Sequence, residues 1–391
     1  MRVMRAGGLA ALTMAFVTSA ASAGVTTDRP AAIVKWPVVA SVDGRLDTVV
    51  QLSNTSRVAP VNAHCFYTNS NPHCTNTGEL CFTAETCCEG PTCGICEPGW
   101  NEIDFFVRIT PGQPLAWRVS EGLAREDFPL DGVVRRGPDG SSNANSRVPP
   151  APEDPFVGEL KCIAVDVNHH PIDDNVLVGQ ATLEQIDGQV FDVAKYNAIG
   201  IQAIEGAVSE DNILVLGGDG AEYNGCPNVT IVNHFSEFVQ DPATEAPCTP
   251  EGPGCIETDL VLVPCAQDLL RQIPGSAVVQ YLVYNEFEQR FSTSRTVTCQ
   301  QVLPLSLIDT TQRQRSIFSA GVLGTVVAQT RLSPIGSGVV AVAFESHGSV
   351  ASMGLGGAAG LVDDGVARRN TAAFNVHYQG DRPDSDLIVL P

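Results

Sequence analysis

The sequence predicts an all-β protein made of two immunoglobulin-like, Greek-key β-sandwich domains, the first carrying a small disulfide-rich insert. Three observations predict this fold. Helical periodicity is almost absent along the 391 residues. Short apolar or alternating segments recur between Gly, Pro, Asn and Asp, as they do in β-sandwiches. The 13 cysteines suit an exported chain that is stapled by disulfides.

The N-terminal segment has the features of a secretory signal peptide. Arg2 and Arg5 form a basic segment that precedes a short apolar run over residues 6–17, and small residues at 21–23 form a cleavage site. We therefore expect cleavage near Ala23 and a secreted, extracellular or cell-surface location, with the periplasm as an alternative. Later apolar runs are too short to span a bilayer, so we expect no transmembrane anchor.

Strand-sized segments follow along the rest of the chain. They are rich in Val, Ile, Phe and Tyr and are bounded by turn-forming residues. These segments are 48–52, 103–109, 160–165, 228–232, 278–284 and 339–344. Sequence alone leaves the strand order open, and a barrel or jelly roll is the alternative architecture.

A weak internal repeat suggests where the domains divide. The segments 49–54 and 228–233 are alike, and so are 195–199 and 373–377, each pair about 180 positions apart. We therefore predict a duplicated module, with domain 1 over 24–206 and domain 2 over 207–391. The segments 106–111 and 259–264 are also alike, at a shorter offset that unequal insertions would explain.

The insert at 74–96 is the sharpest local feature. It has too few large apolar side chains to form a core, so three disulfides are expected, with the pairing left open. Its cysteines are Cys74, Cys81, Cys87, Cys88, Cys93 and Cys96. The adjacent central pair resembles the cystine-knot (knottin-like) pattern, but the very short last loop departs from it. Neither knot topology nor inhibitor activity is carried over from that resemblance. Zinc binding by four thiolates is the alternative.

The remaining cysteines predict further bridges. Cys65 follows one expected strand and Cys162 lies in another, so we expect a disulfide across the first sandwich. Cys248 and Cys255 bracket a short loop that a disulfide can close. Cys226, Cys265 and Cys299 remain, which leaves one odd thiol if the other two pair. That thiol is either buried or available for an intermolecular disulfide.

Catalytic and metal motifs are scarce. The sequence has no G-x-S-x-G and no H-E-x-x-H, so it favours a non-enzymatic protein while leaving the question of catalysis open. His169 and His170 can share a metal only if a turn bends the chain. Asp166, Asp173 and Asp174 offer oxygen ligands for Ca²⁺. No other cofactor is expected.

The charge narrows the range of partners. With 44 acidic and 23 basic residues the net charge is −21, which argues against binding nucleic acid or an anionic membrane through the overall field. We therefore expect a recognition, adhesion or extracellular structural role, with an extracellular protein or a glycan as partner. The alternatives are an extracellular hydrolase acting on glycans, or a ligand-binding or inhibitor function of the insert.

Overall fold

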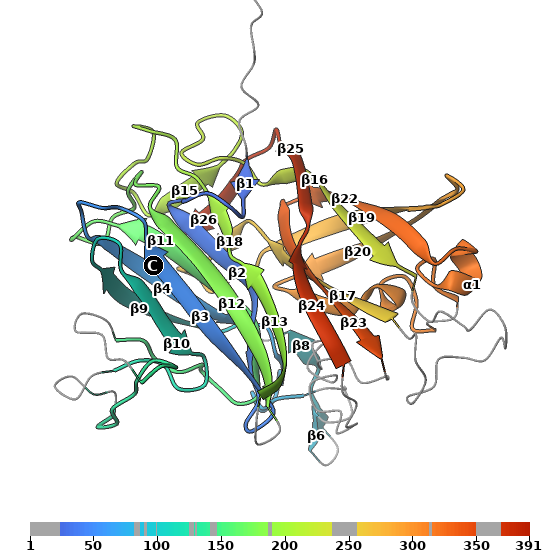
Figure 1. The fold of residues 1–391 in the computed structure, drawn as a ribbon, viewed down its shortest axis with the longest axis horizontal. Coiled ribbons are helices and arrows are strands. Elements are labelled where there is room, and N and C mark those ends of the chain that lie inside the picture. The colour runs from blue at the N-terminus through green and yellow to red at the C-terminus, as the bar shows by residue number, and fades with distance from the viewer. Residues whose placement is uncertain are drawn as a thin grey trace, which may run out of the picture.

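The computed structural model describes most of the chain and shows an all-β protein (Figure 1). The described residues are 24–81, 87–89, 92–98, 100–124, 129, 131–140, 147–186, 190–236, 256–312, 315–348 and 369–391. Strands make up 58% and helices 3%, which confirms the predicted fold class at its coarsest level. The expected signal peptide and the Cys248–Cys255 loop lie outside the described residues.

Two sheets come from the first half of the chain. The six-stranded sheet contains, in spatial order, β1 (Val25–Thr26), β14 (Ile199–Ile201), β2 (Ile33–Ser41), β11 (Phe156–Val165), β4 (Val61–Asn69) and β9 (Glu102–Ile109). The four-stranded sheet contains β10 (Pro114–Arg118), β3 (Leu46–Asn54), β12 (Leu177–Ile186) and β13 (Val190–Asn197).

Three sheets come mainly from the second half. One contains β20 (Arg290–Thr298), β19 (Ser276–Asn285), β22 (Val327–Gly336), β16 (Pro227–Phe235) and β25 (His377–Asp381). The next contains β21 (Gln301–Pro304), β17 (Ile256–Pro264), β23 (Val339–Gly348) and β24 (Arg369–Asn375). The smallest contains β15 (Ile213–Leu216), β26 (Asp386–Val389) and β18 (Gln267–Asp268).

Short elements complete the described chain. The insert forms two small ladders: β5 (Pro72–Cys74) with β8 (Cys96–Pro98), and β6 (Cys88–Glu89) with β7 (Thr92–Cys93). A 3-10 turn, η2 (Leu305–Leu307), and a single-turn helix, α1 (Ala320–Leu323), lie in the second half. No helix of the described residues is long and apolar enough to cross a membrane.

The prediction of two immunoglobulin-like sandwich domains is wrong. The five main sheets are arranged as a five-bladed β-propeller of small sheets, although each sheet draws its strands from distant parts of the chain. Two separate sandwiches would each enclose a core of their own. The larger core instead combines residues of both predicted domains, among them Trp36, Val261 and Phe344. A smaller core lies wholly in the second half, between Val232 and Val376.

Doubly buried strands explain the shared core. Every residue of β2 and of β11 is buried, so both faces of these strands are covered. In β17 the side chains alternate between the two cores: Val261 and Val263 enter the larger core, while Leu260 and Leu262 enter the smaller. Apolar residues on both faces are typical of strands that are covered on both sides.

The internal duplication is also at odds with the structure. Its proposed equivalents occupy different places, because β3 lies between β10 and β12 in a four-stranded sheet while β16 lies between β22 and β25 in a five-stranded one. Likewise β9 is an edge strand, whereas β17 is paired on both sides. The division at 206/207, which depended on this repeat, stays a prediction.

Candidate functional site

The outer face of β3, β12 and β13 carries a groove lined mainly by polar residues. Along β3 the side chains alternate, so that Val50 and Leu52 are buried while Gln51 and Ser53 face outward. The same alternation on β12 turns Val178 and Gln180 outward and Gly179 inward. Gly179 lies over the buried ring of Trp36, and a Cβ atom there would come within 2.2 Å of Trp36 Cζ2.

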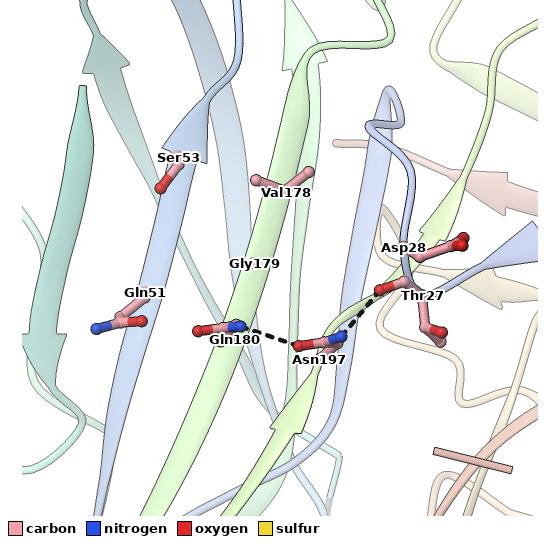
Figure 2. A pocket seen from close by; sticks show the side chains of 8 residues that line it. All are labelled: Thr27, Asp28, Gln51, Ser53, Val178, Gly179, Gln180 and Asn197. Atoms are coloured by element: carbon pink, nitrogen blue, oxygen red, sulfur yellow. Dashed lines mark hydrogen bonds between the residues drawn. The ribbon is translucent and has the colours of Figure 1, made fainter. Parts of the chain in front are cut away.

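These side chains surround a cavity of about 370 Å³ (Figure 2). Its lining is Thr27, Asp28, Gln51, Ser53, Val178, Gly179, Gln180 and Asn197. Gln180 Nε2 donates to Asn197 Oδ1 at 3.0 Å, and Asn197 Nδ2 donates to the Thr27 carbonyl oxygen at 3.1 Å. The hydrogen bonds therefore hold two carboxamides in a row that runs from β12 to the 27–28 loop.

The second half of the chain supports this groove from behind. β13 and β24 lie side by side (Figure 1). Asn375 Nδ2 donates to the Asn197 carbonyl oxygen at 2.9 Å, and the Asn197 backbone N–H donates to Asn375 Oδ1 at 3.2 Å. This reciprocal pair fixes the backbone that carries the Asn197 side chain, so the groove depends on both halves of the chain.

The groove presents donors and acceptors with little formal charge. Carboxamides both donate and accept hydrogen bonds, and the Ser53 hydroxyl does the same. Asp28 is the one acidic residue of the lining, and Thr26 Oγ1 donates to its Oδ1 at 2.7 Å. The lining can therefore both donate and accept hydrogen bonds around the cavity.

A second depression contains the histidine cluster found in the sequence. The Phe106 ring is stacked between those of His64 and His169, with centroid distances of 4.0 and 3.9 Å. His64 Nε2 lies 2.8 Å from Asp104 Oδ2. The cavity here is about 320 Å³ and is lined by His64, Asp104, Phe106, Asn168, His169, His170, Asn212, Leu390 and Pro391. Burial lowers the pKa of His64, and the bond to Asp104 opposes this shift only in part.

Sequence reasoning missed most of this depression. It singled out His169 and His170, but His64 and Asp104 come from β4 and β9, about 60 to 100 positions earlier. The alternation of β9 was the available indication, because Asp104 and Phe106 face outward on one side of that strand. The partner strand could not be inferred from it.

The three predicted calcium ligands do not form one of the groups of close metal-binding atoms found in the described part of the chain. Asp166 Oδ1 accepts from the backbone N–H groups of Asn168 and His170 at 2.7 and 2.9 Å. These bonds, led by the one from His170, lower the pKa of Asp166. Asp173 Oδ2 accepts from the Gly206 N–H at 2.7 Å, and Asp174 contributes its backbone carbonyl to a turn at Val176. Calcium binding by this set stays a prediction.

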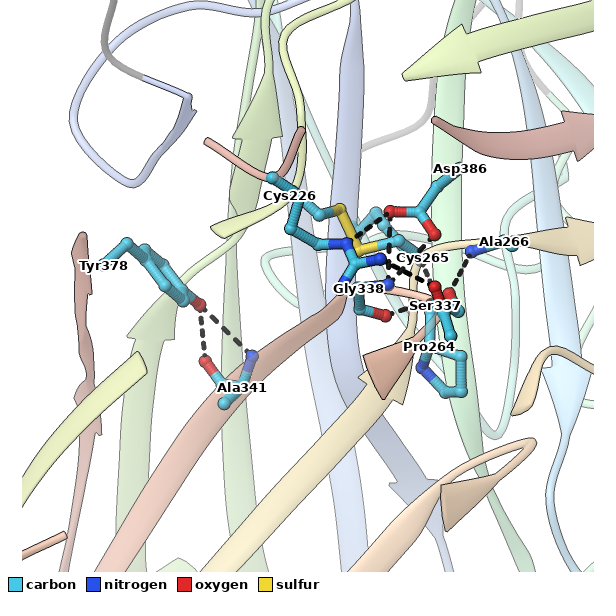
Figure 3. The surroundings of a disulfide bond; sticks show 12 residues. Cys226, Pro264, Cys265, Ala266, Ser337, Gly338, Ala341, Tyr378 and Asp386 are labelled. Carbon is cyan, nitrogen blue, oxygen red and sulfur yellow. Dashed lines mark hydrogen bonds and ion pairs between the residues drawn. A yellow bond between two sulfur atoms is a disulfide. The ribbon is translucent and has the colours of Figure 1, made fainter. Parts of the chain in front are cut away.

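Disulfides account for most cysteines of the described chain. The insert is closed by Cys74–Cys87, Cys81–Cys96 and Cys88–Cys93, and the sheet by Cys65–Cys162 between β4 and β11. A fifth disulfide joins Cys226 to Cys265 beside the Asp386 carboxylate (Figure 3). The two groups of three close metal-binding atoms among the described residues contain these same disulfide sulfurs, so their thiolates are not available to zinc.

Cys299 is buried at 3% exposure, with its thiol 3.5 Å from the Asn69 carbonyl oxygen. Burial raises the pKa of this thiol, and a low thiolate fraction disfavours reaction with a partner chain.

The sequence matches no known family model, and no curated protein shows significant similarity to it.

Proposed function

We propose that this protein acts outside the cytoplasm as a non-enzymatic recognition protein that binds a neutral, hydroxyl-rich ligand of the glycan class. The binding site is the groove across β3, β12 and β13. Export is supported by the N-terminal sequence and by the number of disulfides, which persist in oxidising compartments.

One observation carries this proposal. Gln51, Ser53, Gln180 and Asn197 form an uncharged row around the cavity of about 370 Å³, although the chain as a whole carries a net charge of −21. A charged partner would call for several opposite charges in the groove, and the lining offers only Asp28, which already accepts a hydrogen bond from Thr26. Hydroxyl groups pair well with carboxamides, because each can donate and accept.

A glycan array tests the proposal. The full chain is expected to bind a limited set of neutral glycans, and the double variant Gln51→Ala/Gln180→Ala is expected to lose at least about tenfold in affinity, since one or two hydrogen bonds to the ligand are removed. Gln329→Ala is the matched control, because it removes the same carboxamide from β22, where Gln329 bonds to Asn233 at 3.0 Å. Equal loss in both variants, or no binding of neutral glycans by the wild type, would refute the proposal.

Hydrolysis of a glycan is a second candidate, and it is favoured by the depression around His64. The His64–Asp104 pair borders a cavity, and Glu102 lies two residues from Asp104 on β9. Burial, followed by the charge of Asp104, raises the pKa of Glu102 to about 7. A carboxyl group that holds its proton near neutral pH can serve as the general acid of glycoside cleavage. Turnover of a hydrolase substrate panel that disappears in Asp104→Asn would support this candidate.

A further inference from the structure

Two of the three lysines of this chain are wholly buried. Lys35 on β2 and Lys161 on β11 are paired across the strands and are both 0% exposed. They share a single carboxylate, Glu159, which is 2% exposed. Glu159 Oε1 lies 3.1 Å from Lys35 Nζ and 3.5 Å from Lys161 Nζ.

A carboxamide from the second half of the chain completes the cluster. Gln267 on β18 is buried, its Oε1 contacts Lys161 Nζ, and its Nε2 donates to Glu159 Oε2 at 2.6 Å. Lys35 Nζ donates a hydrogen bond to the Pro264 carbonyl oxygen at 3.2 Å. The amine of Lys161 therefore contacts the carbonyl group of Gln267, and Glu159 touches both.

The charges around Lys161 make its ammonium group easier to deprotonate than that of an ordinary lysine. Two buried ammonium groups share one carboxylate, and a second buried charge is costly without its own partner. Burial lowers the pKa of Lys161 to about 8, and the nearby charge of Lys35 adds to that shift against the pull of Glu159. Burial alone would raise the pKa of Glu159, but the charges of Lys161 and Lys35 outweigh it and the pKa is lowered. A desolvated lysine whose proton is easily removed, beside an ionised carboxylate that can accept it, is a nucleophile with its base in place.

We infer that Lys161 and Gln267 join in an intramolecular isopeptide bond, with Glu159 carrying the protons. Glu159 accepts a proton from the Lys161 ammonium group, and the free Nζ lone pair attacks Cδ of Gln267. Glu159 then returns this proton to Nε2, the Cδ–Nε2 bond breaks and ammonia leaves. The second Nζ proton passes through Glu159 to the departing ammonia, which becomes an ammonium ion as the neutral Nζ–Cδ amide forms. The reaction needs no oxidant, reductant or cofactor, because an ammonium and a carboxamide become a secondary amide and an ammonium ion.

The bond would tie together two segments that are 106 residues apart. β11 belongs to the six-stranded sheet and β18 to the three-stranded one, so the link crosses the shared core between the halves of the chain. Unlike the disulfide at Cys265, two residues from Gln267, an amide withstands reducing agents. The proposed amide bond does not depend on which ligand the groove binds.

Intact mass spectrometry tests the inference on the full chain after complete reduction and denaturation. The wild type is expected to be lighter than its sequence mass, counted from the measured N-terminus, by one ammonia. Digestion with trypsin is expected to give one branched peptide that joins Lys161 to Gln267, with no cleavage after Lys161.

Variants separate this chemistry from a structural effect. Glu159→Gln and Gln267→Leu are expected to retain the full sequence mass, while Lys195→Arg, which changes the remaining lysine, is expected to keep the loss of ammonia. Since the first two variants can also fail to fold, the wild type decides. A folded wild type at full sequence mass, or an ammonia loss located at other residues, would overturn the inference.

Discussion

At the scale of single residues, burial outweighs net charge in setting the chemistry of this protein. Glu102 illustrates this: one of its carboxylate oxygens, Oε2, is buried without a hydrogen-bond partner among the described residues. Burial is the main reason that its pKa is raised from 4.5 to about 7. A raised carboxyl pKa means that the folded state holds the proton more tightly than the unfolded chain, so ionisation costs stability.

Replacing Glu102 with Gln is therefore expected to stabilise the protein only at higher pH. Below about pH 4 the carboxyl is protonated in both states and the variant should match the wild type. The advantage of the variant should grow between about pH 4.5 and 7 and then stay constant. Urea unfolding at several pH values measures this, and an advantage independent of pH would contradict the account.

Gly179 leaves no room for a side chain between β12 and the buried Trp36 ring. Gly179→Ala places a methyl group against the Trp36 ring, and overpacking of this kind costs about 1–3 kcal/mol. Thermal unfolding checks the loss. Gly321→Ala is the control, because a Cβ there meets nothing within 4 Å and alanine is the better helix former. Equal stability of Gly179→Ala and Gly321→Ala would show that the Trp36 ring can move aside at little cost in free energy.

At the scale of elements, the contact between β13 and β24 links the groove to the second half. The predicted internal repeat places Asn197 and Asn375 at equivalent positions of the segments 195–199 and 373–377. In the structure the two residues bond to one another instead, at 2.9 and 3.2 Å. Nothing in the local pattern of either strand indicates such a contact, because periodicity shows which face is apolar and not which strand covers it.

Asn375→Ala is expected to cost about 1–3 kcal/mol, since it leaves backbone groups of Asn197 without a partner. It should also weaken ligand binding in the groove, because Asn197 loses its support. Denaturant unfolding and binding to the best array ligand measure both effects. Asn233→Ala, which removes an exposed hydrogen bond to Gln329, should change neither. Unchanged binding in Asn375→Ala would show that the groove stands without β24.

At the scale of the whole molecule, the sequence predicted the all-β class but not the arrangement of the sheets. Strand-like segments such as 160–165 and 339–344 do lie in β11 and β23. Their continuous apolar character was compatible with two closed sandwiches and with blades that share a core. The groove was even harder to predict from the sequence than the arrangement of the sheets. Its residues Gln51, Gln180 and Asn197 come from three strands and share no local motif.

The shared core predicts that the halves depend on one another. A fragment covering 24–206 would expose the apolar face that Val261 and Phe344 cover in the full chain. We expect it to unfold at lower denaturant concentration than the full chain and to bind a hydrophobic dye. Fluorescence with urea titration measures both properties. Unfolding of the fragment at the denaturant concentration of the full chain would contradict the shared core.

The nature of the ligand is the central claim, and calorimetric titration of the strongest array ligand tests it most directly. For a neutral ligand in the carboxamide groove, the dissociation constant should change less than about twofold between low and high salt, because no ion pairs are screened. Gln180→Ala should raise it at least about tenfold, with Gln329→Ala unchanged. An affinity that falls steeply with salt, or that ignores Gln180, would contradict the account.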